Sequence, residues 1–257
     1  MTKVSIITVS YNSAATIART IEGVLNQTYK NIEYIIVDGA SKDETVDIIK
    51  KYEGSFEGRL RWVSEPDNGI YYAMNKGIEM ATGDLIGIIN SDDWYEPDAV
   101  SIMVDQMEKD HSNPRTVYHG ITAFIVDGQV RSMVKLVSEN LENAMSSHPA
   151  CFVTAACYKE MGVFNTKYVS VADFDLMLRY YRSGKVKFVS VDEHIANSVA
   201  GGMSSTTRAY IDLLHMKADY GKITKTQEFI EVSKAKIADG FKKMGLKPIT
   251  LRRKNGN

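Results

Sequence analysis

The sequence is poor in cysteine and has no excess of either charge. Its 257 residues include two cysteines, Cys151 and Cys157, which do not form a CxxC pair. This spacing offers neither a disulfide framework nor a zinc-binding signature, so we expect two reduced thiols in the core. The 31 basic and 32 acidic residues give a formal net charge of −1. Without an overall electrostatic field, the composition argues against binding to nucleic acid.

Long apolar runs are also missing. A helix that spans a membrane needs about 20 consecutive apolar residues, and no stretch of the sequence reaches this length. The first apolar run, Val4–Val9, is too short and too rich in β-branched residues to be the core of a signal peptide. We therefore expect a cytoplasmic protein. With 44% hydrophobic residues, the chain is long enough to bury a core of its own.

The first half of the sequence alternates short β-branched apolar runs with segments of helical periodicity. This alternation predicts an α/β fold in which helices cover a parallel sheet. Ser41 and Glu44 have the spacing of a capping box before one of the predicted helices. The predicted strands are Val4–Val9, Ile32–Val37, Leu60–Val63 and Leu85–Ile89.

The pattern changes from about Val117. Two apolar runs flank Asp127-Gly128, a typical turn of an antiparallel hairpin, so the sheet is expected to be mixed. Helices are predicted again at Asp173–Arg182 and from Tyr210 to Met244. We expect one domain with a helical C-terminal extension.

Polar clusters follow three of the predicted strands, at Ser10–Asn12, Asp38–Ser41 and Asn90–Trp94. Ligands of open α/β sheets bind at the carboxyl ends of the strands, so these clusters are the candidate binding residues. The two common glycine-rich phosphate motifs, GxGxxG and a P-loop with GKS or GKT, are both absent. A phosphate ligand must therefore be held in another way.

The pair Asp92-Asp93 offers such a way. Adjacent carboxylates at a strand end can hold a hard divalent cation, which in turn bridges two phosphates. In the alternative reading, one of these aspartates caps the helix that begins near Pro97, although Glu96 is closer to that position. Two like charges directly after the apolar run Leu85–Ile89 would repel each other without a compensating cation, and this favours the metal site.

Five segments, taken in sequence order, closely resemble bacterial family 2 glycosyltransferases of the GT-A fold, of the kind that builds O-antigen or capsular polysaccharide. These segments are Val4–Asn12, Ile36–Gly39, Ser64–Tyr71, Ala73–Gly77 and Asn90–Asp93. Three others resemble the family more weakly, namely Ser147–Pro149, Asp173–Leu176 and Gly201–Ser204.

The resemblance implies a Rossmann-like mixed sheet flanked by helices. It implies a glycosyltransferase domain of residues 1–204, with a nucleotide-binding half at 1–95 and an acceptor-binding half at 96–204. Residues 205–257 are then the helical C-terminal extension. A single segment of this kind would be weak evidence, whereas five in the order of the family carry weight together.

The resemblance also implies roles for residues around a uridine nucleotide. Tyr11 would pack on the base, Asp38 would accept a hydrogen bond from uracil, and Asp67 and Lys76 would border the uridine. The alternatives are a turn residue for Tyr11, a helix cap for Asp38 and a solvated surface lysine for Lys76.

For the diphosphate, the resemblance places Asp92 near the ribose and has Asp93 bind Mn²⁺ or Mg²⁺, with Asp92 as the second carboxylate of the metal site. Gly201, Gly202 and Ser204 resemble a loop that closes over the diphosphate once the donor is bound. The alternative for that loop is a plain surface connection.

On the acceptor side, Asp173 matches the acidic residue that deprotonates the acceptor hydroxyl. A metal ligand is committed to its cation, so the base must be a separate carboxylate. His148 is assigned to acceptor binding on the same resemblance, and Trp94 is suited to stacking on the acceptor sugar. The alternatives are a helix cap for Asp173 and a core residue for Trp94.

These assignments predict an inverting transferase. It would move a hexose, glucose being the first expectation, from a UDP-sugar to a lipid-linked oligosaccharide with formation of a β-linkage. Tyr72, Asn90 and Ala172 depart from the family pattern and keep open a sugar-nucleotide binding module without turnover. A sugar nucleotidyltransferase is the other alternative, but it needs a glycine-rich basic loop after the first strand, which Ser10–Ala15 does not provide.

The C-terminal stretch Lys225–Lys254 is rich in lysine and arginine. Its apolar residues could form one face of an amphipathic helix that docks on the inner face of an anionic membrane, where a lipid-linked acceptor would reside. In the alternative, this face packs on the domain. The apolar residues are Phe229, Ile230, Ile237, Phe241 and Met244.

Overall fold

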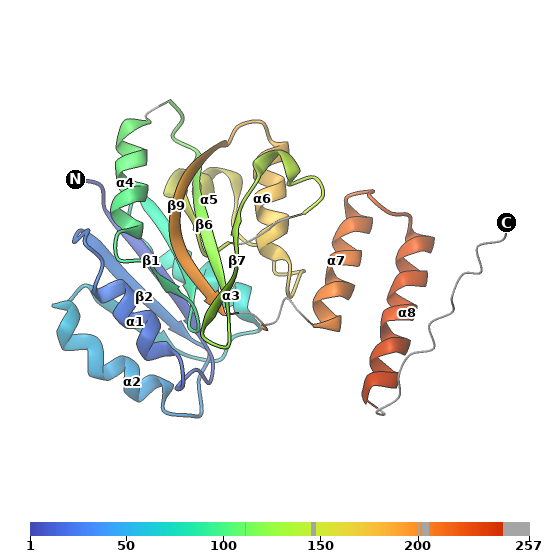
Figure 1. The fold of residues 1–257 in the computed structure, drawn as a ribbon, viewed down its shortest axis with the longest axis horizontal. Coiled ribbons are helices and arrows are strands. Elements are labelled where there is room, and N and C mark those ends of the chain that lie inside the picture. Colours follow the sequence, from blue (N-terminus) through green and yellow to red (C-terminus); the bar gives the residue numbers. More distant parts are fainter. Residues whose placement is uncertain (111, 145–147, 200, 202–205, 244–257) are drawn as a thin grey trace. The chain divides into compact units, whose positions relative to one another are not determined.

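The structure is a computed structural model that describes residues 1–110, 112–144, 148–199, 201 and 206–243 (Figure 1). These residues form two compact units. The first contains residues 1–167 and 172–200, and the second contains residues 168–171 and the described residues from 201 onward. The boundary between 204 and 205, and the division of the first part into two halves, stay predictions.

The first unit is built on a mixed sheet in the order β3-β2-β1-β4-β8-β6-β9-β5, with β7 paired to β6. Neighbours among β1 to β4 are parallel, β8 is antiparallel to β4 and β6, and β6 is parallel to β9. The strands are β1 (Val4–Ser10), β2 (Ile32–Asp38), β3 (Leu60–Ser64), β4 (Leu85–Asn90), β5 (Trp94–Tyr95), β6 (Thr116–Val126), β7 (Gln129–Lys135), β8 (Cys151–Thr154) and β9 (Lys187–Val199).

Helices cover both faces of this sheet, as the continuous burial of β1 and β2 requires. On one face, Ile17, Ile21 and Val24 of α1 pack in a cluster with Val4 and Ile6 of β1. On the other face, α3 approaches β1 so closely that a Cβ on Gly77 would lie 2.5 Å from Cγ2 of Ile7. The helices of this unit are α1 (Ile17–Leu25), α2 (Thr45–Tyr52), α3 (Ile70–Met80), α4 (Ala99–Lys109), α5 (Ala155–Met161) and α6 (Ala172–Arg182), with short 3-10 turns η1 (Glu53–Phe56) and η2 (Ser138–Asn140).

The predicted α/β class, the four strands of the first half and the hairpin are confirmed. The hairpin turn has Asp127 at φ 50° and Gly128 at φ 75°, the left-handed pair that a tight hairpin requires. The capping box was wrong. The helix begins at Thr45 without a side-chain cap, because the amide and the hydroxyl of Ser41 both donate to Asp38 instead.

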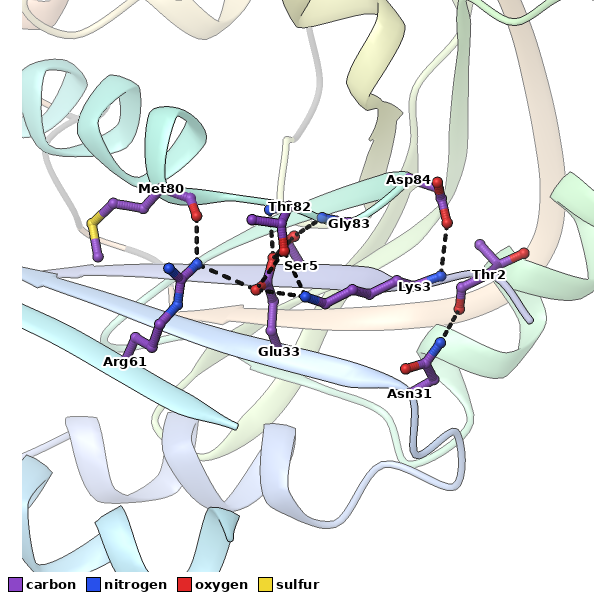
Figure 2. A network of polar contacts seen from close by, with 10 residues as sticks. All are labelled: Thr2, Lys3, Ser5, Asn31, Glu33, Arg61, Met80, Thr82, Gly83 and Asp84. Atoms are coloured by element: carbon purple, nitrogen blue, oxygen red, sulfur yellow. Dashed lines mark hydrogen bonds and ion pairs between the residues drawn. The ribbon is translucent and has the colours of Figure 1, made fainter. Parts of the chain in front are cut away.

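A polar network centred on Glu33 lies at the amino ends of the strands (Figure 2). Glu33, 7% exposed on β2, accepts hydrogen bonds from Ser5 Oγ at 2.5 Å and from the Thr82 amide at 2.6 Å. Its other oxygen lies 3.0 Å from Lys3 Nζ and 3.2 Å from an Arg61 nitrogen. Burial raises the pKa of Glu33, but these donors outweigh burial and lower it to about 2. One carboxylate thus joins β1, β2, β3 and the turn before β4.

The second unit contains α7 (Thr207–Asp219) and α8 (Lys225–Lys243). The sequence predicted helices here, and Gly221, at φ 68°, lies in the break between α7 and α8. His215 of α7 lies 2.6 Å from Glu228 of α8, and Asp212 accepts the amides of Val169 and Ser170, each at 2.7 Å. None of the helices in the described part of the chain combines the length and the apolar character needed to cross a membrane.

Candidate active site

Strand register brings the polar clusters to one edge of the sheet. Ser10 at the end of β1 is paired with Asp38 at the end of β2, and Asp38 with Ser64 at the end of β3. Asn90 ends β4 beside Val9. Residues separated by up to 80 positions in the chain therefore lie together because parallel strands end at a common edge.

Asp38 is fully buried at the centre of this edge. Its Oδ1 accepts the hydroxyls of Ser10 at 3.0 Å and Ser41 at 2.5 Å. Its Oδ2 accepts the Ser41 amide at 2.9 Å and the Ser64 hydroxyl at 2.6 Å. The carboxylate therefore holds three strand ends and the loop after β2 in one arrangement.

Tyr11 follows β1 and is 63% exposed. The next residue, Asn12, lies at φ 49° and is held by the Ser41 hydroxyl and the Lys42 amide, each at 2.8 Å. Beneath the ring, a Cβ on Gly39 would lie 3.4 Å from Tyr11 Cδ2. An exposed ring on a fixed loop can stack on a planar ligand.

Lys76 of α3 binds two carboxylates of the segment that follows β3, Glu65 at 2.6 Å and Asp67 at 2.8 Å. Its side chain is 25% exposed, so Lys76 is not the freely solvated lysine of the alternative reading. The second oxygen of Asp67 is buried and has no hydrogen-bond partner in the described part of the chain. Asp67 therefore retains an acceptor for a ligand.

The aspartate pair lies directly after β4. Asp93 is 2% exposed, and its carboxylate accepts the Val199 amide at 3.0 Å and the Asn90 side-chain amide at 3.3 Å. Burial, followed by the charge of Asp92, raises the pKa of Asp93 to about 6. A buried carboxylate beside another carboxylate is stabilised by a cation.

The residues fit a divalent metal ion by their chemistry. Asp92 and Asp93 supply hard oxygen ligands at the end of a buried strand, and Asn90 adds a buried Oδ1 to which no described residue donates a hydrogen bond. Across the residues that the structure describes, no cluster of three or more His, Cys, Asp or Glu side chains could form a complete site. A cation here would need further oxygen ligands from a phosphate group or water.

Asp173, in the first turn of α6, lies between two other side chains. Its Oδ1 accepts the Tyr71 hydroxyl at 3.0 Å, and its Oδ2 lies 3.3 Å from Nδ1 of His148. Burial raises the pKa of Asp173, but the hydrogen bond and the charge of His148 outweigh burial and hold this pKa below its usual value. The carboxylate is therefore ionised at neutral pH, as a base must be.

His148 contacts Asp173 and also responds to the charges of the aspartate pair. Burial lowers the pKa of His148, but the charges of Asp173, Asp93 and Asp92 outweigh burial and raise it. Its Nε2 is buried and has no hydrogen-bond partner among the residues that the structure describes. The predicted base, Asp173, and the predicted metal ligands, Asp92 and Asp93, thus all raise the pKa of one imidazole.

Trp94 begins β5 and lies against α1. The Arg19 guanidinium stacks on its ring, 3.8 Å from the centroid, and donates to the Asp92 carbonyl at 2.8 Å. Arg19 therefore covers one face of the indole and anchors the backbone of the aspartate pair. Stacking of Trp94 on an acceptor stays a prediction.

The predicted glycine loop is only partly described. Gly201, at φ 109°, adopts a backbone conformation that favours glycine. Gly202 and Ser204 lie outside the described residues. The role of this loop stays a prediction.

The sequence reading gave no individual role in the site to Tyr71 or Arg19. Tyr71 stands within a segment that carried the resemblance, but nothing in the local sequence pairs it with Asp173. Asp175, two residues after Asp173 in α6, is ion-paired with Arg179 at 2.8 Å on the same helix.

Comparison with known proteins finds a family that matches more than half of this chain. A family model described as "Glycosyl transferase family 2" matches residues 5–159. A chondroitin synthase of Pasteurella multocida is 32% identical over 191 residues, which is 73% of this chain. The chain spans about a fifth of the length of that relative, since the match covers 20% of it.

Solved structures share the fold at low identity. S. aureus TarS 1-349 in complex with UDP-GlcNAc has a TM-score of 0.68 and 17% identity, with 93% of this chain and 73% of that chain covered. The mannosyltransferase PcManGT from Pyrobaculum calidifontis in complex with GDP-Man and Mn²⁺ has a TM-score of 0.63 and 15% identity, with 92% and 69% covered. Together with the sheet order, these likenesses show the GT-A fold.

Proposed function

Since the chain belongs to glycosyl transferase family 2, we propose that it transfers a hexose, glucose in the first instance, from a UDP-sugar to a lipid-linked oligosaccharide. The transfer inverts the anomeric configuration and serves the synthesis of a bacterial surface polysaccharide, O-antigen or capsule. The observation that carries this proposal is the 3.3 Å contact between the predicted base Asp173 and His148, an imidazole on which the charges of Asp93 and Asp92 also act.

A uridine donor is supported by the edge of the sheet around Asp38. Tyr11 offers an exposed ring for the base, and Asp67 offers a buried unpaired oxygen beside Lys76. Asp38 was predicted to accept from uracil, but each of its oxygens already accepts two hydrogen bonds, so it supports the base indirectly, through the loops that it holds. TarS, which shares the fold, is described in complex with UDP-GlcNAc.

The diphosphate belongs beside Asp92 and Asp93, where the chain would hold Mn²⁺ or Mg²⁺. A bound divalent cation supplies positive charge that stabilises the departing diphosphate. The Mn²⁺ complex of PcManGT supports this choice at the level of the fold. Arg19 keeps the backbone of the pair in place through the Asp92 carbonyl.

Asp173 is the base of the proposed reaction. Its ionised carboxylate takes the proton from the acceptor hydroxyl while the hydroxyl oxygen attacks the anomeric carbon. The bond from that carbon to the diphosphate breaks on the opposite face, so an α-linked donor gives a β-linked product. Proton transfer of this kind contributes on the order of 10²–10⁴ in rate.

The acceptor would contact His148 and Trp94. The buried Nε2 of His148 has no partner within the described chain and is available to a sugar hydroxyl. Trp94 is partly exposed, and Arg19 covers one face of its ring.

A membrane contact through the C-terminal helices is supported by α8. Phe229, Ile230 and Ile237 are 74%, 44% and 60% exposed, so α7, the other helix of their unit, leaves them uncovered. Sedimentation with anionic vesicles at low and high salt tests the contact. We expect salt-sensitive binding that Phe229→Ser abolishes, and equal recovery with and without vesicles would remove this part of the proposal. Phe241, whose side chain is not described, and Met244 lie outside this evidence.

The function is tested by incubating the purified chain with Mn²⁺ and a panel of sugar nucleotides, with and without EDTA, and following UDP release. We expect metal-dependent release from one UDP-hexose. Binding of UDP without release from any donor would instead identify a module without turnover. Release of pyrophosphate from UTP and a sugar phosphate would identify a nucleotidyltransferase.

A further inference from the structure

We infer that Tyr71 and His148 are positioning residues for Asp173, and that they leave its Oδ2 atom to take the proton of the acceptor. The inference rests on the proposed function, in which Asp173 is the base. It adds two residues from other elements, and it assigns different tasks to the two oxygens of one carboxylate.

The hydrogen bonds at Asp173 are unequal. Oδ1 accepts two donors, the Tyr71 hydroxyl at 3.0 Å and the Phe174 amide at 2.9 Å. Oδ2 has the longer contact with Nδ1 of His148, at 3.3 Å. An ionised carboxylate oxygen accepts about two hydrogen bonds. The acceptor capacity of Oδ1 is therefore used, whereas Oδ2 can accept one more hydrogen bond.

Tyr71 is well fixed for this task. It is 7% exposed, and its ring centroid lies 5.4 Å from that of Phe164. Asn75, one turn further along α3, exchanges two hydrogen bonds with the backbone of Phe164, at 2.9 and 3.0 Å. Burial, followed by the charge of Asp173, raises the pKa of Tyr71 well above its usual value, so its hydroxyl stays a donor.

His148 holds the second oxygen. Because ionised Asp173 is only an acceptor, Nδ1 of His148 must carry the proton of this contact. The titratable groups that act on or respond to Asp173 are Tyr71 on α3, His148 before β8 and Cys151 on β8, and the charges of Asp93 and Asp92 also act on His148. Nδ1 of His148 thus donates to Asp173, and Nε2 is left for the acceptor in the proposed function.

Fixing the plane of the carboxylate has a direct chemical consequence. A base must lie within about 2.6–3.2 Å of the proton that it removes, in the correct orientation. A carboxylate held by one donor rotates about its Cβ–Cγ bond and presents Oδ2 to the acceptor only part of the time. Donors on both oxygens restrict that rotation, so they raise kcat without adding a contact to the substrate.

The test begins with Tyr71→Phe, which removes the hydroxyl and retains the ring. We expect kcat for transfer to fall about tenfold, while the KM of the donor stays within about twofold. Loss of one donor also raises the pKa of the carboxylate. The acid limb of the pH profile of kcat should therefore move up by ~0.5–1 pH unit.

Tyr180→Phe is the matched control. Tyr180 lies on α6 with Asp173, is fully buried, and donates to the Gly162 carbonyl at 2.7 Å. This variant loses a buried hydrogen bond of the same helix without touching Asp173. We expect its melting temperature to fall and its pH profile to match that of the wild type.

Two variants of His148 distinguish the contribution of Nδ1 from that of Nε2. They test the inference even if Tyr71→Phe fails to fold. Asn places an amide nitrogen near the position of Nδ1, and Gln places one near Nε2. We expect His148→Asn to keep the wild-type acid limb and His148→Gln to move it upward.

Wild-type kcat and an unshifted acid limb in both Tyr71→Phe and His148→Gln would overturn the inference. An equal shift in Tyr180→Phe would also overturn it, since the effect would then be structural. Failure of the proposed function looks different, because wild-type protein would release no UDP, or Asp173→Asn would remain active.

Discussion

The Ser64 hydroxyl at the end of β3 donates a 2.6 Å hydrogen bond to Oδ2 of Asp38 at the end of β2. This contact is one of four that a single buried carboxylate accepts, and the others come from Ser10 and Ser41. Nucleotide binding and local stability are therefore expected to depend on the same residue.

Asp38→Asn should weaken both properties. An amide offers one acceptor oxygen in place of two and adds two donors that face the existing hydroxyls. We expect the free energy of unfolding to fall by about 2 kcal/mol, measured by urea denaturation. Ser64→Ala, which removes one donor, should cost about 1 kcal/mol. An Asp38→Asn variant with unchanged stability and unchanged UDP affinity would contradict the role assigned to this carboxylate.

Asp93→Ala and Asp173→Asn should fail in different ways. Both should reduce UDP release to background. Only Asp93→Ala should lose the dependence of nucleotide affinity on Mn²⁺, because Asp93, unlike Asp173, is assigned to the metal. Calorimetric titration of UDP with Mn²⁺ or EDTA separates the two. Intact turnover in either variant would reject the role given to that residue.

Arg19→Met should loosen the aspartate pair without removing a carboxylate. Arg19 donates to the Asp92 carbonyl and stacks on Trp94, and methionine retains part of the stacking volume. We expect affinity for UDP with Mn²⁺ to fall about tenfold, which corresponds to about 1.4 kcal/mol. Arg131→Met, an exposed change on β7, is the control and should bind as the wild type does.

Glu33 should make stability depend on acid pH. Its pKa is lowered from 4.5 to about 2, so its contribution is complete above pH 4.5 and is lost as the pH falls toward 2. We expect Glu33→Gln to cost about 2 kcal/mol at pH 7 and progressively less at lower pH. Urea denaturation at several pH values measures this, with Glu79→Gln, exposed on α3, as the control. An equal loss at pH 7 and pH 2.5 would contradict the assignment.

The first half of the fold could be predicted because its signals are local. Four apolar runs defined β1 to β4, and the polar residues that follow them had to meet wherever parallel strands end together. The capping box at Ser41 failed for a tertiary reason. Asp38 competes for both donors of Ser41, and no spacing within the helix reveals that competitor.

The acceptor side was predicted less completely. Asp173 and His148 were both singled out, but their contact was not, and Tyr71 was missed altogether. These residues come from three segments that no sequence period connects. The helices expected from Tyr210 onward are present as α7 and α8, but the sequence did not place the break between them at Gly221.

The sequence by itself determined the α/β class, the carboxylates and the edge of the sheet where they gather, because strand periodicity and turn chemistry act over a few residues. Only the tertiary structure decided that Tyr71 and His148 hold Asp173, that Arg19 covers Trp94, and that Asp38 is saturated. Those contacts join residues that are far apart in the chain. They exist because packing the sheet and its helices fixes distances that local propensity does not specify.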